Sequence, residues 1–183
     1  MDRYYKKRSD PWSRSTAIAE VQAAVKLVSD KRYNRCLDIG TGLGYFVEAV
    51  SPLCDTCLAI DISDEAIKKA RLRLPESTIE FKLINVRKFE PKNKFDLIIC
   101  GDVLYYLGDA LLPEEFTKLI TKISSWIDSG GRILLTHEAL PSRNEDWFWK
   151  NYVEKFKEHG LRVEKQKKFQ QGKIIWLHVV LTK

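Results

Sequence analysis

The sequence predicts one α/β domain built on a doubly wound, mostly parallel sheet. Short apolar segments alternate with amphipathic segments five times between residues 35 and 159. The fourth apolar segment, FDLIIC at 95–100, has the continuous hydrophobicity of a strand that is covered on both faces. Near the end of the chain, two β-rich runs at 161–169 and 173–181 flank a Gln-Gly turn. They predict a hairpin, which adds antiparallel strands to the parallel sheet.

Each element follows from its own pattern. Parallel strands are predicted at 35–39, 56–60, 79–84, 95–100 and 132–137. Helices are predicted at 16–29, 45–50, 64–74, 113–126 and 144–159. Ser63 is the expected N-cap of the helix at 64–74, Pro113 occupies a first helical turn, and Gly160 ends the last helix.

Length and composition limit the class of protein. A chain of 183 residues with 44% hydrophobic residues can bury one sizeable core, so we expect a single domain over 1–183. Residues 1–14 lack the apolar run of a signal peptide, and no stretch has the roughly 20 apolar residues of a membrane span. We therefore expect a cytoplasmic protein.

Charge is unevenly distributed along the chain. Residues 1–14 hold five basic and two acidic side chains (+3), and residues 150–183 hold nine and three (+6), so a total of +6 leaves −3 in the middle. This predicts a basic rim around a slightly acidic centre if the two ends lie away from the functional site. A basic rim can attract nucleic acid, although solvated lysines on terminal elements are the simpler interpretation.

Four cysteines are present, and two of them form a C-x-x-C pattern. Cys36 and Cys100 fall in predicted interior strands, where a small hydrophobic residue is expected, and Cys54 and Cys57 form the C-x-x-C. The prediction is reduced structural thiols, with neither a metal site nor disulfides.

The glycine-rich segment 36–45, CLDIGTGLGY, is the most informative part of the sequence. A strand runs into Gly40, Gly42 and Gly44 and then into a helix, and glycines there let the backbone approach a ligand. The spacing G-x-G-x-G departs from the G-x-G-x-x-G of dinucleotide sites. Asp38 precedes the loop, where a carboxylate repels a diphosphate but suits a ligand with an ammonium and a sulfonium group. This charge favours S-adenosylmethionine over NAD.

Asp61 ends the second predicted strand, about 20 residues after the loop, where a carboxylate can accept both hydroxyls of a ribose. With D-x-G-x-G-x-G, this strand-end acid and the C-terminal hairpin, the chain from Tyr33 onward resembles the class I S-adenosylmethionine-dependent methyltransferases. The resemblance implies a Rossmann-like methyltransferase fold: seven strands, the last antiparallel, with a core at 33–183. It also implies an N-terminal lid and helix at 1–30, in which the region ahead of the helix, with Tyr4, Tyr5 and Trp12, folds over the cofactor. Frayed terminal residues are the alternative.

The resemblance further implies residue roles. The glycine loop would cradle the methionine part of the cofactor, Asp61 would hold the ribose, and Asn85 would accept from the adenine amino group where the family often has an acid. A turn-forming role for Asn85 is an equal alternative. The full set predicted to bind S-adenosylmethionine, with S-adenosylhomocysteine as product, is Asp38, Gly40, Thr41, Gly42, Gly44, Asp61, Ile62, Asn85, Val86 and Gly101.

The acceptor of the methyl group is expected beyond the fourth and fifth strands, because ligands of doubly wound sheets bind at the carboxyl ends of the strands. The segment FDLIICGDVLYYL at 95–107 and the DPW ending at Trp12 resemble the nodulation protein S type of N-methyltransferase. That family methylates an amine on a chitin-derived oligosaccharide, so the resemblance implies a small acceptor such as an amine or amino sugar.

Catalysis in this interpretation uses two residues. His137 is the predicted general base, and Asp102 is predicted to orient or bind a cationic acceptor. Tyr105, Tyr106 and Trp12 are predicted to contact the substrate. A lone histidine at a strand end is also a common structural residue, and paired tyrosines often pack under a helix.

Two other functions fit parts of the sequence. An RNA methyltransferase would use the basic ends and exposed aromatic residues, but no N-P-P-Y-like motif for a planar base amine is present. A non-catalytic S-adenosylmethionine-binding regulatory protein would also need the glycine loop, since the loop indicates only nucleoside binding. Acidic residues at Asp38, Asp61 and Asp102 favour activity.

Overall fold

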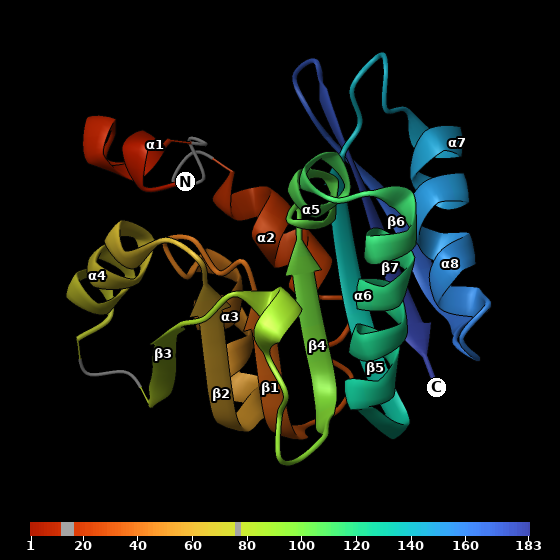
Figure 1. Cartoon of the computed structure of the whole chain (residues 1–183), viewed down its shortest axis with the longest axis horizontal. Coiled ribbons are helices and arrows are strands. Elements are labelled where there is room, and N and C mark those ends of the chain that lie inside the picture. The colour runs from red at the N-terminus through yellow and green to blue at the C-terminus, as the bar shows by residue number, and fades with distance from the viewer. Residues whose placement is uncertain (12–16, 76–77) are drawn as a thin grey trace.

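The computed structural model describes residues 1–11, 17–75 and 78–183, and its centre is one seven-stranded sheet (Figure 1). The strands run in the order β3-β2-β1-β4-β5-β7-β6. They are β1 (Tyr33–Ile39), β2 (Cys54–Asp61), β3 (Ile79–Leu83), β4 (Phe95–Gly101), β5 (Ile127–Glu138), β6 (Arg162–Gln171) and β7 (Ile174–Thr182). The first five are parallel, and β7 pairs antiparallel with both β5 and β6. The predicted doubly wound sheet with an antiparallel C-terminal hairpin is confirmed.

Helices cover both faces of the sheet. On one face, α2 (Ile18–Val25), α3 (Tyr45–Val50) and α4 (Asp64–Arg73) pack over β1, β2 and β4 in an apolar cluster that contains Val21, Val47 and Ile67. On the other face, α5 (Leu104–Ala110), α6 (Pro113–Trp126) and the C-terminal helical segment form a second cluster around Ile98 and Ile120. The central strands are thus buried on both faces, as the apolar run at 95–100 indicated.

The last helix is interrupted by a wider turn. Sequence periodicity predicted one helix over 144–159, and the structure has α7 (Glu145–Phe148), a π-helical stretch η4 (Trp149–Val153) and α8 (Glu154–Lys157) in continuous succession. Asn144 caps its start, because the Asn144 side chain accepts a hydrogen bond from the backbone N–H of Trp147 at 3.0 Å.

Two short helices were not predicted. α1 (Asp2–Lys7) lies against α4 (Figure 1), and α5 follows β4 directly. Short 3₁₀ turns, η2 (Ser51–Leu53) and η3 (Val86–Lys88), complete the elements. No helix within these described ranges is long and apolar enough to cross a bilayer.

Candidate cofactor and acceptor site

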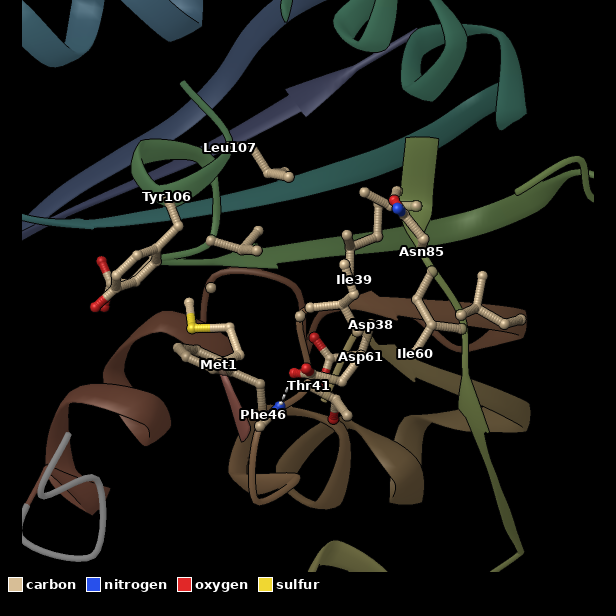
Figure 2. Close-up of a pocket in the computed structure, with 18 of the residues that line it drawn as sticks. Met1, Asp38, Ile39, Thr41, Phe46, Ile60, Asp61, Asn85, Tyr106 and Leu107 are labelled. Carbon is tan, nitrogen blue, oxygen red and sulfur yellow. Dashed lines mark hydrogen bonds between the residues drawn. The ribbon is translucent and has the colours of Figure 1, made fainter. Parts of the chain in front are cut away.

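A cavity of about 340 Å³ opens at the carboxyl ends of β1, β2 and β4 (Figure 2). The glycine loop forms its floor, and residues that follow β2, β3 and β4 form its walls. Nine of the ten residues predicted to bind cofactor line this cavity: Asp38, Gly40, Thr41, Gly42, Asp61, Ile62, Asn85, Val86 and Gly101. Residues far apart in sequence therefore meet at the edge where ligands of such sheets bind.

The loop conformation requires glycine. Gly40, Gly42 and Gly44 have φ angles of +72°, +56° and +82°, in the left-handed region. A Cβ on Gly40 would lie 2.4 Å from Cγ2 of Val103, and one on Gly42 would lie 2.8 Å from the Tyr5 hydroxyl. Gly44, the predicted cofactor residue that does not line the cavity, is the N-cap of α3. Side chains on the first two glycines would therefore distort the cavity floor.

Asp38 is the most unusual group in the cavity. Its side chain is buried at the end of β1 near the Thr41 hydroxyl, and neither Asp38 Oδ2 nor Thr41 Oγ1 makes a hydrogen bond of normal geometry among the described residues. Burial raises the pKa of Asp38 to about 7. A buried, unsatisfied carboxyl oxygen beside a ligand cavity is costly in the free protein, and a bound cation would remove that cost.

Asp61 holds the loop from the neighbouring strand. Its carboxylate accepts hydrogen bonds from the backbone N–H of Gly42 at 3.0 Å and of Ser63 at 2.8 Å. Burial raises the pKa of Asp61, while these bonds favour the ionised form. Each carboxylate oxygen can accept a second hydrogen bond, so a ribose hydroxyl can still be bound.

Asn85 lies at the far end of the cavity from Tyr106 (Figure 2). Its Oδ1 accepts a hydrogen bond from the backbone N–H of Arg87 at 3.0 Å and so caps the turn η3. This is the predicted turn-forming role. The carbonyl oxygen keeps a second lone pair, and the residue lines the cavity, so a bound adenine amino group remains compatible with the geometry.

Asp102 joins the ends of β4 and β5 in a strained conformation. Its φ is +52°, and it is the one non-glycine residue with positive φ among the described residues. Its Oδ1 accepts from the backbone N–H of Glu138 at 2.8 Å, and its own N–H donates to the carbonyl of Thr136 at 3.2 Å. The cavity wall thus carries a carboxylate whose position is fixed by two strands.

Of the two tyrosines after β4, one lines the cavity and the other does not. Tyr106 lines the cavity, whereas Tyr105 does not. Their rings are in contact, with centroids 3.8 Å apart, and the guanidinium of Arg143 lies 4.8 Å from the centroid of the Tyr105 ring. Tyr105 therefore packs against Tyr106, and the substrate contact predicted for both residues stays a prediction.

His137 lies outside the cavity lining, which differs from its predicted place beside the methyl acceptor. It is 2% exposed, its ring stacks on Phe148 with centroids 5.0 Å apart, and its Nε2 is 2.9 Å from the carbonyl oxygen of Arg143. Since a carbonyl can only accept, Nε2 carries the proton. Burial lowers the pKa of His137, which favours the neutral ring. These surroundings favour a structural role, and the catalytic role stays a prediction.

The N-terminal segment, which the resemblance implied to be a lid, lies beside the site. Met1, Tyr5 and Asp10 line the cavity, so the basic N-terminal segment does not lie away from it as the charge pattern suggested. Two side chains of the α4 region fasten α1: the hydroxyl of Ser63 donates to Asp2 at 2.5 Å, and Lys69 donates to the carbonyls of Tyr5 and Arg8. Trp12, the remaining predicted substrate residue, lies outside the described residues.

The apolar residues of the cavity wall were also not predicted from the sequence. Phe46, Val103, Leu107 and Leu111 line the cavity, and Phe46 faces Gly101, where an added Cβ would lie 2.7 Å from its ring. Phe46 directly follows the glycine-rich segment 36–45, at the start of α3, and this position in the sequence could have indicated that it lines the cavity. The helix α5, which presents Leu107, was not predicted.

The fold is that of solved S-adenosylmethionine-dependent methyltransferases, which match it along nearly the whole chain. The N-methyltransferase NodS from Bradyrhizobium japonicum, solved in complex with S-adenosyl-L-homocysteine, superposes with a TM-score of 0.77 at 21% identity and covers 99% of this chain and 98% of that one. An S-adenosylmethionine-dependent methyltransferase from Clostridium acetobutylicum has a TM-score of 0.72 at 12% identity, covering 94% and 95%.

Within this class, the chain belongs to the family described as Nodulation protein S (NodS), whose profile matches residues 3–139. Nodulation protein S of Bradyrhizobium diazoefficiens is 32% identical over 107 residues, which are 56% of this chain and 51% of that protein. Nodulation protein S of Rhizobium tropici is 38% identical over 99 residues, 54% of this chain and 40% of that protein. The chain therefore spans about half the length of the curated relatives it matches.

Proposed function

We propose that this protein transfers a methyl group from S-adenosylmethionine to the nitrogen of a small amine or amino sugar. One observation carries the proposal: the left-handed glycine loop lies between two carboxyl groups in one cavity. They are Asp38, whose buried Oδ2 makes no hydrogen bond of normal geometry among the described residues, and Asp61, which ends β2. Cationic ligands satisfy the first group and ribose hydroxyls satisfy the second. Family membership and the shared fold support the same cofactor.

The residues present fit this cofactor. Asp38 and the backbone of Gly40 and Gly42 would hold the methionine part, whose ammonium and sulfonium groups are positive. Asp61 would accept from the ribose, and Asn85 would lie at the adenine end. When bound, S-adenosylmethionine supplies an electrophilic methyl carbon on a positively charged sulfur.

The acceptor would enter from the side of Asp102 and Tyr106. An in-line displacement requires the nucleophile, the methyl carbon and the sulfur to be aligned in a site from which water is excluded. Apolar Val103 and Leu107 line the same side of the cavity and exclude water, while Asp102 would orient a cationic or hydrogen-bonding acceptor. An amine nucleophile must also lose a proton during the reaction.

The N-terminal segment would serve as the lid. Met1 and Tyr5 already line the cavity, and the Tyr5 hydroxyl approaches Gly42. We propose that α1 covers the bound cofactor and that ties from Ser63 and Lys69 hold it there. A cytoplasmic location is part of the same proposal.

Cofactor choice can be tested by isothermal titration of the purified protein. We expect S-adenosylmethionine and S-adenosylhomocysteine to bind, and NAD to show no saturable binding, because a diphosphate would be placed near Asp38 and Asp61. Saturable NAD binding with no response to either methionine nucleoside would overturn the proposed function. A mass-shift screen of amines with the loaded protein then identifies the acceptor.

The role of His137 needs a variant that separates structure from catalysis. We expect His137→Gln to retain most of the turnover, because a glutamine amide can still donate to the carbonyl of Arg143, and we expect His137→Ala to lower the free energy of unfolding by about 1–3 kcal/mol. The measurements are steady-state kinetics with the identified acceptor and chemical denaturation. A loss of turnover of about tenfold or more in His137→Gln, with unchanged cofactor affinity, would assign the base to His137.

A further inference from the structure

Three of the four cysteines meet in a cluster that the proposed methyl transfer does not use. The Sγ atoms of Cys36, Cys54 and Cys57 all lie within 4.8 Å of one another. Cys36 and Cys57 are partners in the parallel register of β1 and β2, so their side chains share a face, and Cys54 begins β2. None of the three forms a disulfide.

The side chains that pack on the cluster are mostly apolar, and two carboxyl groups lie near it, Asp96 near Cys54 and Asp38 near Cys57. All three cysteines belong to the apolar cluster beneath α3, with Val47 and Val50. The Cys54 thiol donates to the carbonyl of Val50 at 3.3 Å. Cys36 and Cys57 are 1% and 4% exposed, and Cys54, at the start of β2, is the most exposed of the three at 9%. Core packing alone requires only small hydrophobic residues here and does not require three sulfurs in one place.

The separation of the sulfurs fits coordination of a single ion. Ligands at a metal–sulfur distance of about 2.3 Å are separated from one another by about 4 Å in tetrahedral or trigonal geometry. The three Sγ atoms would reach that separation by movements of less than about 1 Å, which χ1 adjustments can supply. Thiolate sulfur is a soft ligand that selects ions such as Cu(I) and Zn(II).

We propose that Cys36, Cys54 and Cys57 form a three-sulfur site for a soft, monovalent ion of the Cu(I) type. Zinc sites take four ligands, and no histidine or carboxylate of the described residues joins this group, whereas three sulfurs alone complete a trigonal site. Each thiol that ligates the ion releases its proton to the solvent, so binding is accompanied by proton release. The sequence pattern predicted no metal because it could not show that β1 brings a third sulfur to the C-x-x-C.

The full-length protein, reduced and free of oxygen, provides the test. We expect one equivalent of Cu(I) to be retained in competition with a colorimetric Cu(I) chelator, and X-ray absorption to find three sulfur neighbours around the ion. Cys36→Ala, Cys54→Ala and Cys57→Ala should each weaken retention at least about tenfold. Cys100→Ala is the matched control, because Cys100 is equally buried in β4 but belongs to the other apolar cluster, and it should bind as the unmodified protein does.

Several results would overturn the proposal. They are failure of the unmodified protein to retain Cu(I), fewer than three sulfur neighbours, an equal loss in Cys100→Ala, or equally tight retention by protein unfolded in denaturant. The sulfur count is measured on unmodified protein, so it decides the matter even where an alanine variant fails to fold. Titration with S-adenosylmethionine uses metal-free protein, and the sulfur count uses cofactor-free protein, so the two proposals fail separately.

Discussion

Asp38→Asn should lower the affinity for S-adenosylmethionine by about 10- to 100-fold at pH 7.5, because the cofactor cation loses a buried carboxylate partner. The size of this effect should depend on pH. Burial raises the pKa of Asp38 to about 7, so the free protein increasingly carries a neutral carboxyl below that pH. Affinity of the unmodified protein should fall as pH drops from 8 to 6, and the variant should show a much flatter profile. Isothermal titration across this range measures both.

The same substitution should affect stability in the opposite sense. A carboxyl whose folded pKa is raised contributes stability that is fully present below the unfolded pKa, near 3.8, and is lost as pH rises through about 7. Each pH unit by which the folded pKa exceeds the unfolded pKa corresponds to about 1.4 kcal/mol of stability. Asp38→Asn should therefore raise the free energy of unfolding by a few kcal/mol at pH 8 and by much less at pH 5. Denaturation at the two pH values checks this.

Asp55→Asn is the control for charge alone, because the Asp55 side chain is 61% exposed and pairs with the exposed Arg32. It should leave both cofactor affinity and stability nearly unchanged. Unchanged cofactor affinity in Asp38→Asn at pH 7.5 would contradict the role of Asp38 and, with it, the electrostatic basis of the proposed function.

Arg132→Met should lower the free energy of unfolding by about 2–4 kcal/mol at pH 7. The Arg132 side chain is 8% exposed and makes two hydrogen bonds to Asp30, at 2.5 and 3.1 Å, and two to Glu164. It also donates to the Tyr33 hydroxyl at 3.1 Å. Methionine fills similar space but leaves both carboxylates without their main cation. Because Asp30 is half exposed, the cost should fall at the lower end of the range for a broken buried pair.

The pH dependence of this second effect follows from the carboxylates. Arg132 holds the pKa values of Asp30 and Glu164 below their ordinary range. Carboxyl groups with lowered folded pKa values contribute stability that is present above the unfolded pKa and is lost as pH falls. The difference between the unmodified protein and Arg132→Met should therefore begin to shrink below about pH 5 and continue to shrink as the pH falls below the ordinary carboxyl pKa.

Arg32→Met is the matched control, since the Arg32–Asp55 pair is exposed on both sides and should contribute less than about 1 kcal/mol. Equal unfolding free energies for Arg132→Met and the unmodified protein would show that the cluster joining β1, β5 and β6 contributes no net stability.

The local sequence was sufficient for the strands and most helices. Strands such as 95–100 are uninterrupted apolar runs, and α6 begins at Pro113 and ends at Trp126 as its residues indicated. Such patterns are local because the period of side-chain burial reflects the geometry of the element itself. By contrast, α1 is six mostly polar residues long and has no apolar period. It is held by α4, and short helices gain most of their stability from such tertiary contacts.

The glycine loop with its two flanking acids could be predicted from the residues alone, because positive φ and a strand-end carboxylate are properties of single residues at fixed spacing. The other side chains that share the cavity were settled by tertiary packing. Because of this packing, Tyr106, Met1 and Tyr5 line the cavity while Tyr105 does not. The same packing stacks His137 on Phe148 and places Cys36 beside the C-x-x-C cysteines. These placements depend on strand register and helix packing, which join residues up to about a hundred positions apart and leave no local pattern to detect.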